Sequence, residues 1–223
     1  MSFNVLEFCR QRQIPVIFGS TREVYGDIHP YITEESHADF AYTESPYAAS
    51  KISGEALVYS YAACYDIPYL VFRFSNVYGR YDNDLERMER VIPLFIKKIY
   101  LGEPIVVYGE NKVLDFTYID DCVTGVRAGI DVLVEGRPAN QTINLAYGQG
   151  NSLVDMAKFI GEELGKEPNM TVEPSRVGEV THYIANIGKA RAMLDYTPTT
   201  PLREGIKKTV AWAMAYWQEH GGL

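Results

Sequence analysis

Hydrophobic and polar positions alternate between two patterns along the chain. Short apolar runs have the length and density of strands buried on both faces of a parallel sheet. The main runs of this kind are "IPVIFGS" (14–20), "IPYLVFRFS" (67–75) and "QTINLAYG" (141–148). Apolar residues recurring every three or four positions predict helices. These helices cover residues 2–12, 46–65, 91–101 and 202–219. The alternation predicts an α/β fold with a mostly parallel sheet.

Shorter elements fill the second half of the chain. "EPIVVYG" and "KVLDFTYI" predict two short strands around a turn at Glu110-Asn111, and "NMTVEP" predicts another strand. "DDCVTGVRAGIDVLV" predicts a helix with Asp120 or Asp121 at its N-cap. "SLVDMAKFIGEELG" predicts a helix between a Ser152 N-cap and Gly165. These short strands and loops indicate a smaller lobe from about residue 80 onward.

Composition and charge narrow the class of protein. The 223 residues are 47% hydrophobic and 22% charged, with a formal net charge of −8. No basic run is present, which argues against a nucleic-acid partner, and no stretch is apolar enough to span a membrane. Cys9, Cys64 and Cys122 are odd in number and lack metal-ligand spacing, so we expect reduced, buried thiols, no metal and a cytoplasmic location.

Candidate acid–base chemistry begins with Tyr47 and Lys51 in the helix predicted over 46–65. The two are four residues apart, so they lie on one helix face. An ammonium beside a phenol lowers the phenol's pKa from about 10. Tyr47 is therefore a candidate base, and the alternative is a solvated pair on an amphipathic helix.

Two further polar residues follow the strand predicted over 14–19. Ligands bind at the carboxyl edge of a parallel sheet, where Thr21 lies just past the strand. Its hydroxyl is a candidate partner for a substrate hydroxyl whose proton Tyr47 takes. The alternative interpretations are a turn residue for Thr21 and a surface acid for Glu23.

In order and spacing, five motifs resemble the extended short-chain dehydrogenase/reductase family. "STREVYGD" resembles its "SSxxVYG" turn, "SPYAASK" its YxxxK motif, and "VFRFSNVYG" a segment that holds the sugar nucleotide. "PIVVYGENKVLDFTYIDD" resembles the substrate-lobe hairpin and the "DFxxVDD" helix start, and "SRVGEV…ANIGKARAMLDYTPTTPLREGI" the C-terminal part. The members that the chain resembles most are nucleotide-sugar 4-epimerases, with related dehydratases and decarboxylases.

The resemblance implies roles for individual residues, with NAD as cofactor and a nucleotide sugar, a UDP-sugar above all, as substrate. The implied catalytic residues are Thr21, Tyr47, Lys51 and Glu23. The implied cofactor contacts are Tyr47, Lys51 and Ser20. The implied substrate contacts are Asn76, Arg80, Arg90, Tyr108, Arg176 and Glu179, with Arg87 as an alternative to Arg90 at the diphosphate.

The resemblance also implies a division of the chain. Residues 1–80 would form the C-terminal part of a Rossmann-like doubly wound parallel sheet. Residues 81–223 would form mainly a smaller α/β substrate-binding lobe, with a late strand near 141–147 returning to the sheet. The sequence has no glycine-rich dinucleotide loop. We therefore expect a truncated form, an open edge at the strand over 14–19, and contacts to the nicotinamide half of NAD only.

Departures from the family pattern leave the reaction open. Dehydratases carry Asp-Glu and decarboxylases Ser-Glu where this chain has Arg22-Glu23. A guanidinium does not release its proton in proteins, which disfavours a dehydratase, whereas Glu23 keeps a UDP-glucuronate decarboxylase possible. A 4-epimerase acting through a 4-keto sugar is favoured. Leu114 replaces the "RDF" arginine of many relatives, and Arg80 is an alternative partner for a uronic acid carboxylate.

One enzymatic and two non-enzymatic interpretations remain. The chain is either an enzyme, a nucleotide-sugar-binding fragment without redox chemistry, or an assembly unit completed by another chain. Relatives dimerise through the helix that bears YxxxK, which implies a homodimer for the full-length form. A second apolar stripe on that helix, Ala48, Leu57 and Tyr61, is the candidate surface, and packing inside the fold is the alternative.

Overall fold

A three-stranded parallel sheet forms one end of the molecule. In this computed structural model, the described residues are 2–26, 35, 38, 43, 45–82, 90–175 and 180–220. The sheet has the order β1-β2-β6. Its strands are β1 (Val16–Thr21), β2 (Tyr69–Phe74) and β6 (Gln141–Leu145). Ser20 pairs with Arg73, which in turn pairs with Asn144, so these three side chains form a row across the sheet.

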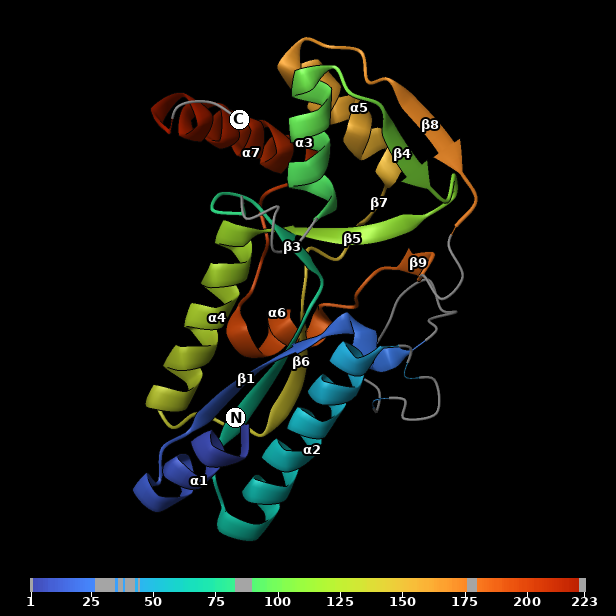
Figure 1. Cartoon of the computed structure of the whole chain (residues 1–223). Helices are drawn as coiled ribbons and strands as arrows, with labels where there is room; N and C mark the ends of the chain where they lie inside the picture. Colours follow the sequence, from blue (N-terminus) through green and yellow to red (C-terminus); the bar gives the residue numbers. More distant parts are fainter. Residues whose placement is uncertain are drawn as a thin grey trace.

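Helices cover both faces of this sheet (Figure 1). On one face α1 (Ser2–Arg12) and α2 (Pro46–Tyr65) pack through Leu6, Cys9 and Val58 against Val16 and Val71. On the other face α4 (Ile119–Val134) and α6 (Gly188–Leu194) join the larger core, which includes Leu70, Phe72 and Ile143. This layering, with apolar strand residues on both faces, agrees with the α/β fold predicted from the buried runs.

The remaining elements form the upper part of the molecule in Figure 1, where β5 crosses beneath α3, α5 and α7. In this part β3, β5 and β7 form a sheet that β9 extends by pairing with β5, and β4 pairs with β8. The strands are β3 (Asn76–Tyr78), β4 (Ile105–Tyr108), β5 (Val113–Tyr118), β7 (Gly150–Ser152), β8 (Met170–Glu173) and β9 (His182–Tyr183). The helices are α3 (Val91–Leu101), α5 (Leu153–Leu164) and α7 (Leu202–Glu219).

The ends of α5 follow the capping residues that the sequence indicated. The Ser152 side chain accepts a hydrogen bond from the Asp155 amide at 3.0 Å, and Gly165 ends α5 in the left-handed conformation. At α2, the Ser45 side chain caps the helix by accepting from the Ala48 amide at 3.0 Å. The bounds predicted for α1, α2, α3 and α7 are confirmed.

The predicted hairpin of β4 and β5 is wrong. The two strands are close in sequence, but β4 runs parallel to β8, with Ile105 opposite Met170. β5 instead pairs with β3, β7 and β9. Alternating apolar residues indicate a strand, but they do not select its partner, because several strands present equivalent backbone groups.

The predicted cap of α4 is also wrong. Its N-cap is Tyr118, which makes no side-chain capping bond, and Asp120 and Asp121 lie within the first turn. Asp121 instead accepts hydrogen bonds from the Thr199 and Thr200 amides at 3.1 and 2.9 Å. The carboxylate therefore anchors the segment that leads into α7.

The second stripe of α2 packs inside the fold. Ala48 is 2% exposed and Tyr61 is 7% exposed, with Tyr61 in the cluster beneath α1. These side chains are thus not available to a second subunit. The three cysteines are unpaired, but only Cys9 and Cys122 are buried, and Cys64 is exposed, contrary to the expectation of three buried thiols. Among the described residues, no helix has the length and apolarity needed to cross a membrane.

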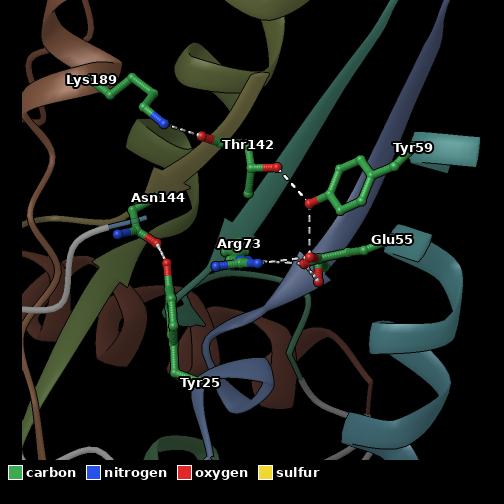
Figure 2. Close-up of polar contacts among 8 residues, drawn as sticks. Tyr25, Glu55, Tyr59, Arg73, Thr142, Asn144 and Lys189 are labelled. Atoms are coloured by element: carbon green, nitrogen blue, oxygen red, sulfur yellow. Dashed lines mark hydrogen bonds and ion pairs between the residues drawn. The ribbon is translucent and has the colours of Figure 1, made fainter. Parts of the chain in front are cut away.

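A buried ion pair joins α2 to the sheet (Figure 2). Arg73 donates to both carboxylate oxygens of Glu55, at 3.0 and 2.7 Å, and both side chains are 2% exposed. The Glu55 carboxylate also accepts hydrogen bonds from the Ser20 hydroxyl at 2.5 Å and from the Tyr59 hydroxyl at 2.9 Å. Burial raises the pKa of Glu55, but these hydrogen bonds outweigh burial and hold the pKa below its usual value.

Asp115 links the upper sheet to the loop that follows β6. Its carboxylate accepts hydrogen bonds from the backbone amides of Tyr147, Gly148 and Ala185 at 3.1, 2.9 and 3.2 Å. The side chain is fully buried. Burial raises the pKa of Asp115 to about 6, although the three amides act in the opposite direction.

The edge of the first sheet is open at β1, as predicted from the sequence. In the described part of the chain, β1 pairs with β2 alone. Ile17 and Phe18 on this strand are half-buried. The outer backbone groups of β1 are thus available to another strand.

We expect Glu55→Gln to lower the free energy of unfolding by about 3–5 kcal/mol, because the buried guanidinium of Arg73 then lacks its carboxylate. Urea denaturation measures the change. The matched control is Glu162→Gln, which breaks the exposed ion pair with Arg203 and should cost less than about 1 kcal/mol. Equal effects of the two substitutions would contradict the importance of the buried pair.

For Asp115 we predict a stability contribution that falls as pH rises. Its folded pKa of about 6 exceeds the unfolded value of about 3.9. Between those values the folded chain binds more protons than the unfolded chain, so ionisation destabilises the fold, by roughly 3 kcal/mol in total.

The comparison of wild type with Asp115→Asn in urea at pH 4, 5, 6 and 7 isolates this group, since the other carboxylates cancel. The stability of wild type relative to the variant should decline across the series. A rise with pH would mean that the amides outweigh burial and that the folded pKa is depressed.

Candidate active site

A cavity of about 650 Å³ opens at the carboxyl ends of β1 and β2. Its wall combines β1, the following 3₁₀ turn η1 (Arg22–Tyr25), α2, β3, α3 and β5. The volume lies in the range of small-molecule sites. The residues predicted for the site that line this cavity are Ser20, Thr21, Glu23, Tyr47, Lys51, Asn76 and Arg90.

Tyr47 and Lys51 lie one turn apart on α2, as their spacing predicted. The Lys51 Nζ atom is 5.6 Å from the centre of the Tyr47 ring and donates to the Gly19 carbonyl at 2.8 Å. This bond ties the lysine to the end of β1 and leaves two of its three N–H groups for other acceptors. The Tyr47 side chain is 51% exposed, so its phenol is accessible to a ligand.

Thr21 ends β1 and begins the η1 turn. Its side-chain oxygen accepts a hydrogen bond from the Glu23 amide at 3.3 Å. The Thr21 O–H can therefore donate to a ligand oxygen while the lone pair holds the turn. Glu23 lies two residues further along, where its carboxylate accepts from Ser45 at 3.3 Å, which links the turn to the start of α2.

Ser20 contributes to the floor of the cavity. Its hydroxyl donates to Glu55, and the residue is 3% exposed. The proton of this hydroxyl is thus committed to the buried network. Ser20 positions the end of β1 relative to α2, and its predicted contact to a cofactor stays a prediction.

Asn76 presents an amide held by the main chain of β5. Its Nδ2 donates to the Asp115 carbonyl at 2.8 Å, and Ser75 donates to the same carbonyl. The Asp115 residue whose side chain anchors the loop after β6 therefore also orients Asn76 through its backbone. This arrangement fixes the plane of the amide at the cavity wall.

The other predicted substrate contacts are distributed differently. Arg90 lines the cavity and pairs with Asp82 at 3.4 Å. Arg80 forms a two-point ion pair with Asp120, at 2.8 and 2.6 Å, and does not line the cavity. Tyr108 lies at the end of β4, opposite Glu173 of β8, and is also absent from the cavity wall. Arg87, Arg176 and Glu179 fall outside the described residues.

Arg22 also lines the cavity. From the sequence it was noted only as the residue that stands where dehydratases carry an acid, and it was not predicted as a site residue. Its Nη1 atom is buried without a hydrogen-bond partner, and its guanidinium lies 5.6 Å from the centre of the Tyr183 ring. Burial lowers the pKa of Arg22, with the nearby Glu23 opposing that shift. The Arg22-Glu23 pair was visible in the sequence, but its burial depends on β9, which no sequence pattern indicated.

The apolar part of the wall was not predicted as a site either. Leu114, Phe116 and Cys122 line the cavity and are nearly fully buried. Burial raises the pKa of the Cys122 thiol to about 12, with the Asp121 carboxylate adding to the shift, so this cysteine stays protonated at neutral pH. These three side chains exclude water from one side of the cavity.

Comparisons with known proteins agree with this geometry. The profile of the NAD dependent epimerase/dehydratase family matches residues 1–146. An uncharacterised UDP-glucose epimerase of Bacillus subtilis, YtcB, is 29% identical over 96% of this chain and 65% of its own length. A dTDP-glucose 4,6-dehydratase of Haemophilus influenzae is 31% identical over 86% of this chain and 59% of its own length.

A solved structure gives the same result at the level of the fold. The crystal structure of UDP-glucuronic acid 4-epimerase from Bacillus cereus, in complex with UDP-glucuronic acid and NAD, superimposes with a TM-score of 0.86 at 27% identity. The match covers 97% of this chain and 67% of that one. The chain thus spans about two thirds of the length of these relatives.

The family profile covers well over half of the chain, and the matched range includes all the residues that line the cavity. On these grounds the chain belongs to the NAD dependent epimerase/dehydratase family, whose fold is Rossmann-like and whose cofactor is NAD.

Proposed function

We propose that this protein is an NAD-dependent nucleotide-sugar 4-epimerase that acts on a UDP-sugar through a 4-keto intermediate. The observation that carries the proposal is the convergence of Thr21, Tyr47 and Lys51 on one cavity. Asn76 and Arg90 line the same cavity and supply candidate contacts to the sugar and the diphosphate. The names of the relatives support a UDP-sugar as the substrate class.

The side chains suit removal of a proton from the 4-hydroxyl of a sugar. Tyr47 is exposed to the cavity and takes the proton as a general base. Thr21 donates a hydrogen bond to the same oxygen and orients it. Lys51 is fixed by the Gly19 carbonyl, and its ammonium lies 5.6 Å from the centre of the Tyr47 ring. Accurate placement of these three groups lowers the barrier, because the reacting atoms need little reorientation.

The residues present fit one part of NAD. Lys51 keeps N–H groups beyond its bond to Gly19, and with Tyr47 it is the candidate for holding the nicotinamide ribose. When bound, NAD supplies the hydride acceptor and donor for C4. The sequence contains no glycine-rich loop for the pyrophosphate. This chain by itself would therefore hold NAD weakly.

A decarboxylase is the second candidate, and one observation favours it. Glu23 lines the cavity beside Thr21, where an acid is placed to act on a 4-keto intermediate. A dehydratase is less favoured, because Arg22 occupies the position of its acid and cannot release a proton. Analysis of the product separates the reactions, since epimerisation conserves mass, decarboxylation releases carbon dioxide and dehydration releases water.

We also propose a cytoplasmic homodimer. Phe3, Val5 and Phe8 on α1 are all more than half exposed, an apolar surface of the kind that pairs with a second copy. The buried stripe of α2 does not supply this surface.

For Tyr47→Phe, assayed with added NAD and a UDP-sugar, we expect turnover to fall about 100-fold or more, because the variant lacks the phenolic base. The affinity for the UDP-sugar should stay within about twofold, since the ring remains. Turnover is measured by chromatography of the sugar epimers, and affinity by calorimetry. The matched control is Tyr65→Phe, an exposed tyrosine on the same helix. Unchanged turnover in Tyr47→Phe would remove the base from the mechanism.

A further inference from the structure

Among the described residues, the guanidinium of Arg22 in the cavity wall has no ionic partner. Its Nη1 atom is buried and donates no hydrogen bond to any acceptor in the described part of the chain. In the part of the chain that the structure describes, the group in direct contact with its charge is the Tyr183 ring, 5.6 Å away. A ring face returns only part of the hydration that a buried guanidinium loses. The site is therefore incomplete without an anion.

The nearby acids do not complete it. Glu23 and Asp115 both act on Arg22 through their charges, but neither forms an ion pair with it. An oxygen of Glu23 accepts a bond from Ser45. The Asp115 carboxylate accepts from three backbone amides. Both acids are thus held by other donors.

The other cations of the cavity differ from Arg22 in this respect. Lys51 donates to the Gly19 carbonyl at 2.8 Å, and Arg90 pairs with Asp82 at 3.4 Å. Arg80, the arginine that the sequence suggested for a uronic acid, is engaged in two contacts with Asp120 outside the cavity. Among these arginines and lysines, Arg22 is the one suited to an anion brought by a ligand.

The position of Arg22 defines where that anion lies. Arg22 follows Thr21 directly, and both residues line the cavity with Tyr47. A sugar whose 4-hydroxyl meets Thr21 and Tyr47 presents to the next residue a substituent on a carbon adjacent to C4. The adjacent carbons are C3 and C5, and the common anionic substituent there is the C6 carboxylate carried by C5.

We propose that Arg22 selects nucleotide sugars with a C6 carboxylate, that is UDP-hexuronates, over neutral UDP-hexoses. This inference rests on the proposed function, because it takes the 4-hydroxyl to lie at Tyr47. The guanidinium donates hydrogen bonds in a planar fork that matches the two oxygens of a carboxylate. A neutral CH₂OH group at C6 leaves the cation uncompensated.

The first experiment changes the ligand and leaves the protein intact. Calorimetry of the chain, with and without NAD, compares UDP, UDP-glucose, UDP-glucuronate and the uncharged amide UDP-glucuronamide. We expect UDP-glucuronate to bind on the order of tenfold or more tighter than UDP-glucose. The amide has nearly the shape of the acid but no charge, and it should bind like UDP-glucose. Equal affinity for acid and amide would overturn the proposal.

The second experiment changes the protein. Arg22→Gln should abolish the preference for UDP-glucuronate, with its folding checked by thermal melting, and Arg22→Lys should retain part of it. Arg137→Gln removes an exposed positive charge that does not line the cavity and should leave the preference intact. Arg80→Gln tests the competing arginine. If the preference disappears with Arg80 and survives loss of Arg22, the assignment is wrong.

The outcomes separate this inference from the proposed function. Binding of UDP and of both sugars with equal affinity would refute the role of Arg22 and leave a nucleotide-sugar site in place. Failure of UDP and all three UDP-sugars to bind, with or without NAD, would refute the proposed function and the inference with it.

Discussion

The ion pair of Glu55 and Arg73 fixes the helix that carries the candidate chemistry. Tyr47, Lys51, Glu55 and Tyr59 follow one another at intervals of four residues, so they form a single polar stripe along α2. Every member below Tyr47 is bound to the sheet: Lys51 to Gly19, Glu55 to Arg73, and Tyr59 to Thr142 at 2.7 Å. With three attachments along its length, α2 has one rotation and one height on the sheet, and Tyr47 at its N-terminal end lines the cavity.

Arg73 and Arg22 are both buried, but their guanidinium groups have different partners. Arg73 lies 4.6 Å from the centre of the Tyr25 ring, Tyr25 stacks with Tyr183, and Arg22 lies over the far ring. Arg73 has the Glu55 carboxylate, so its charge is satisfied within the fold. Within the described ranges of the chain, Arg22 has no such partner. A buried ion pair adds little net stability but is costly to break, whereas a buried cation without an anion is a site for one.

Local signals in the sequence were sufficient for most of the helices and for the shared face of Tyr47 and Lys51. Ser152 and Gly165 bound α5 because capping depends on a few neighbouring residues, and the spacing of Tyr47 and Lys51 determines their common face. Partners distant in sequence were not predictable in this way. The pairing of β4 with β8 and the burial of Arg22 against Tyr183 join segments more than sixty residues apart. No periodicity in either segment encodes the other.

Asp115 holds two sides of the cavity in a fixed position relative to each other. Thr21, Tyr47 and Lys51 belong to β1 and α2, whereas the apolar wall belongs to β3, α3, β5 and α4. Asp115 lies on β5. Its carboxylate accepts hydrogen bonds from backbone amides of the loop that follows β6, and β6 is a strand of the first sheet. Its carbonyl holds Asn76 at the cavity. A shift of β5 relative to the first sheet would break both sets of bonds together, so the position of Asn76 follows that of the sheet that carries Thr21.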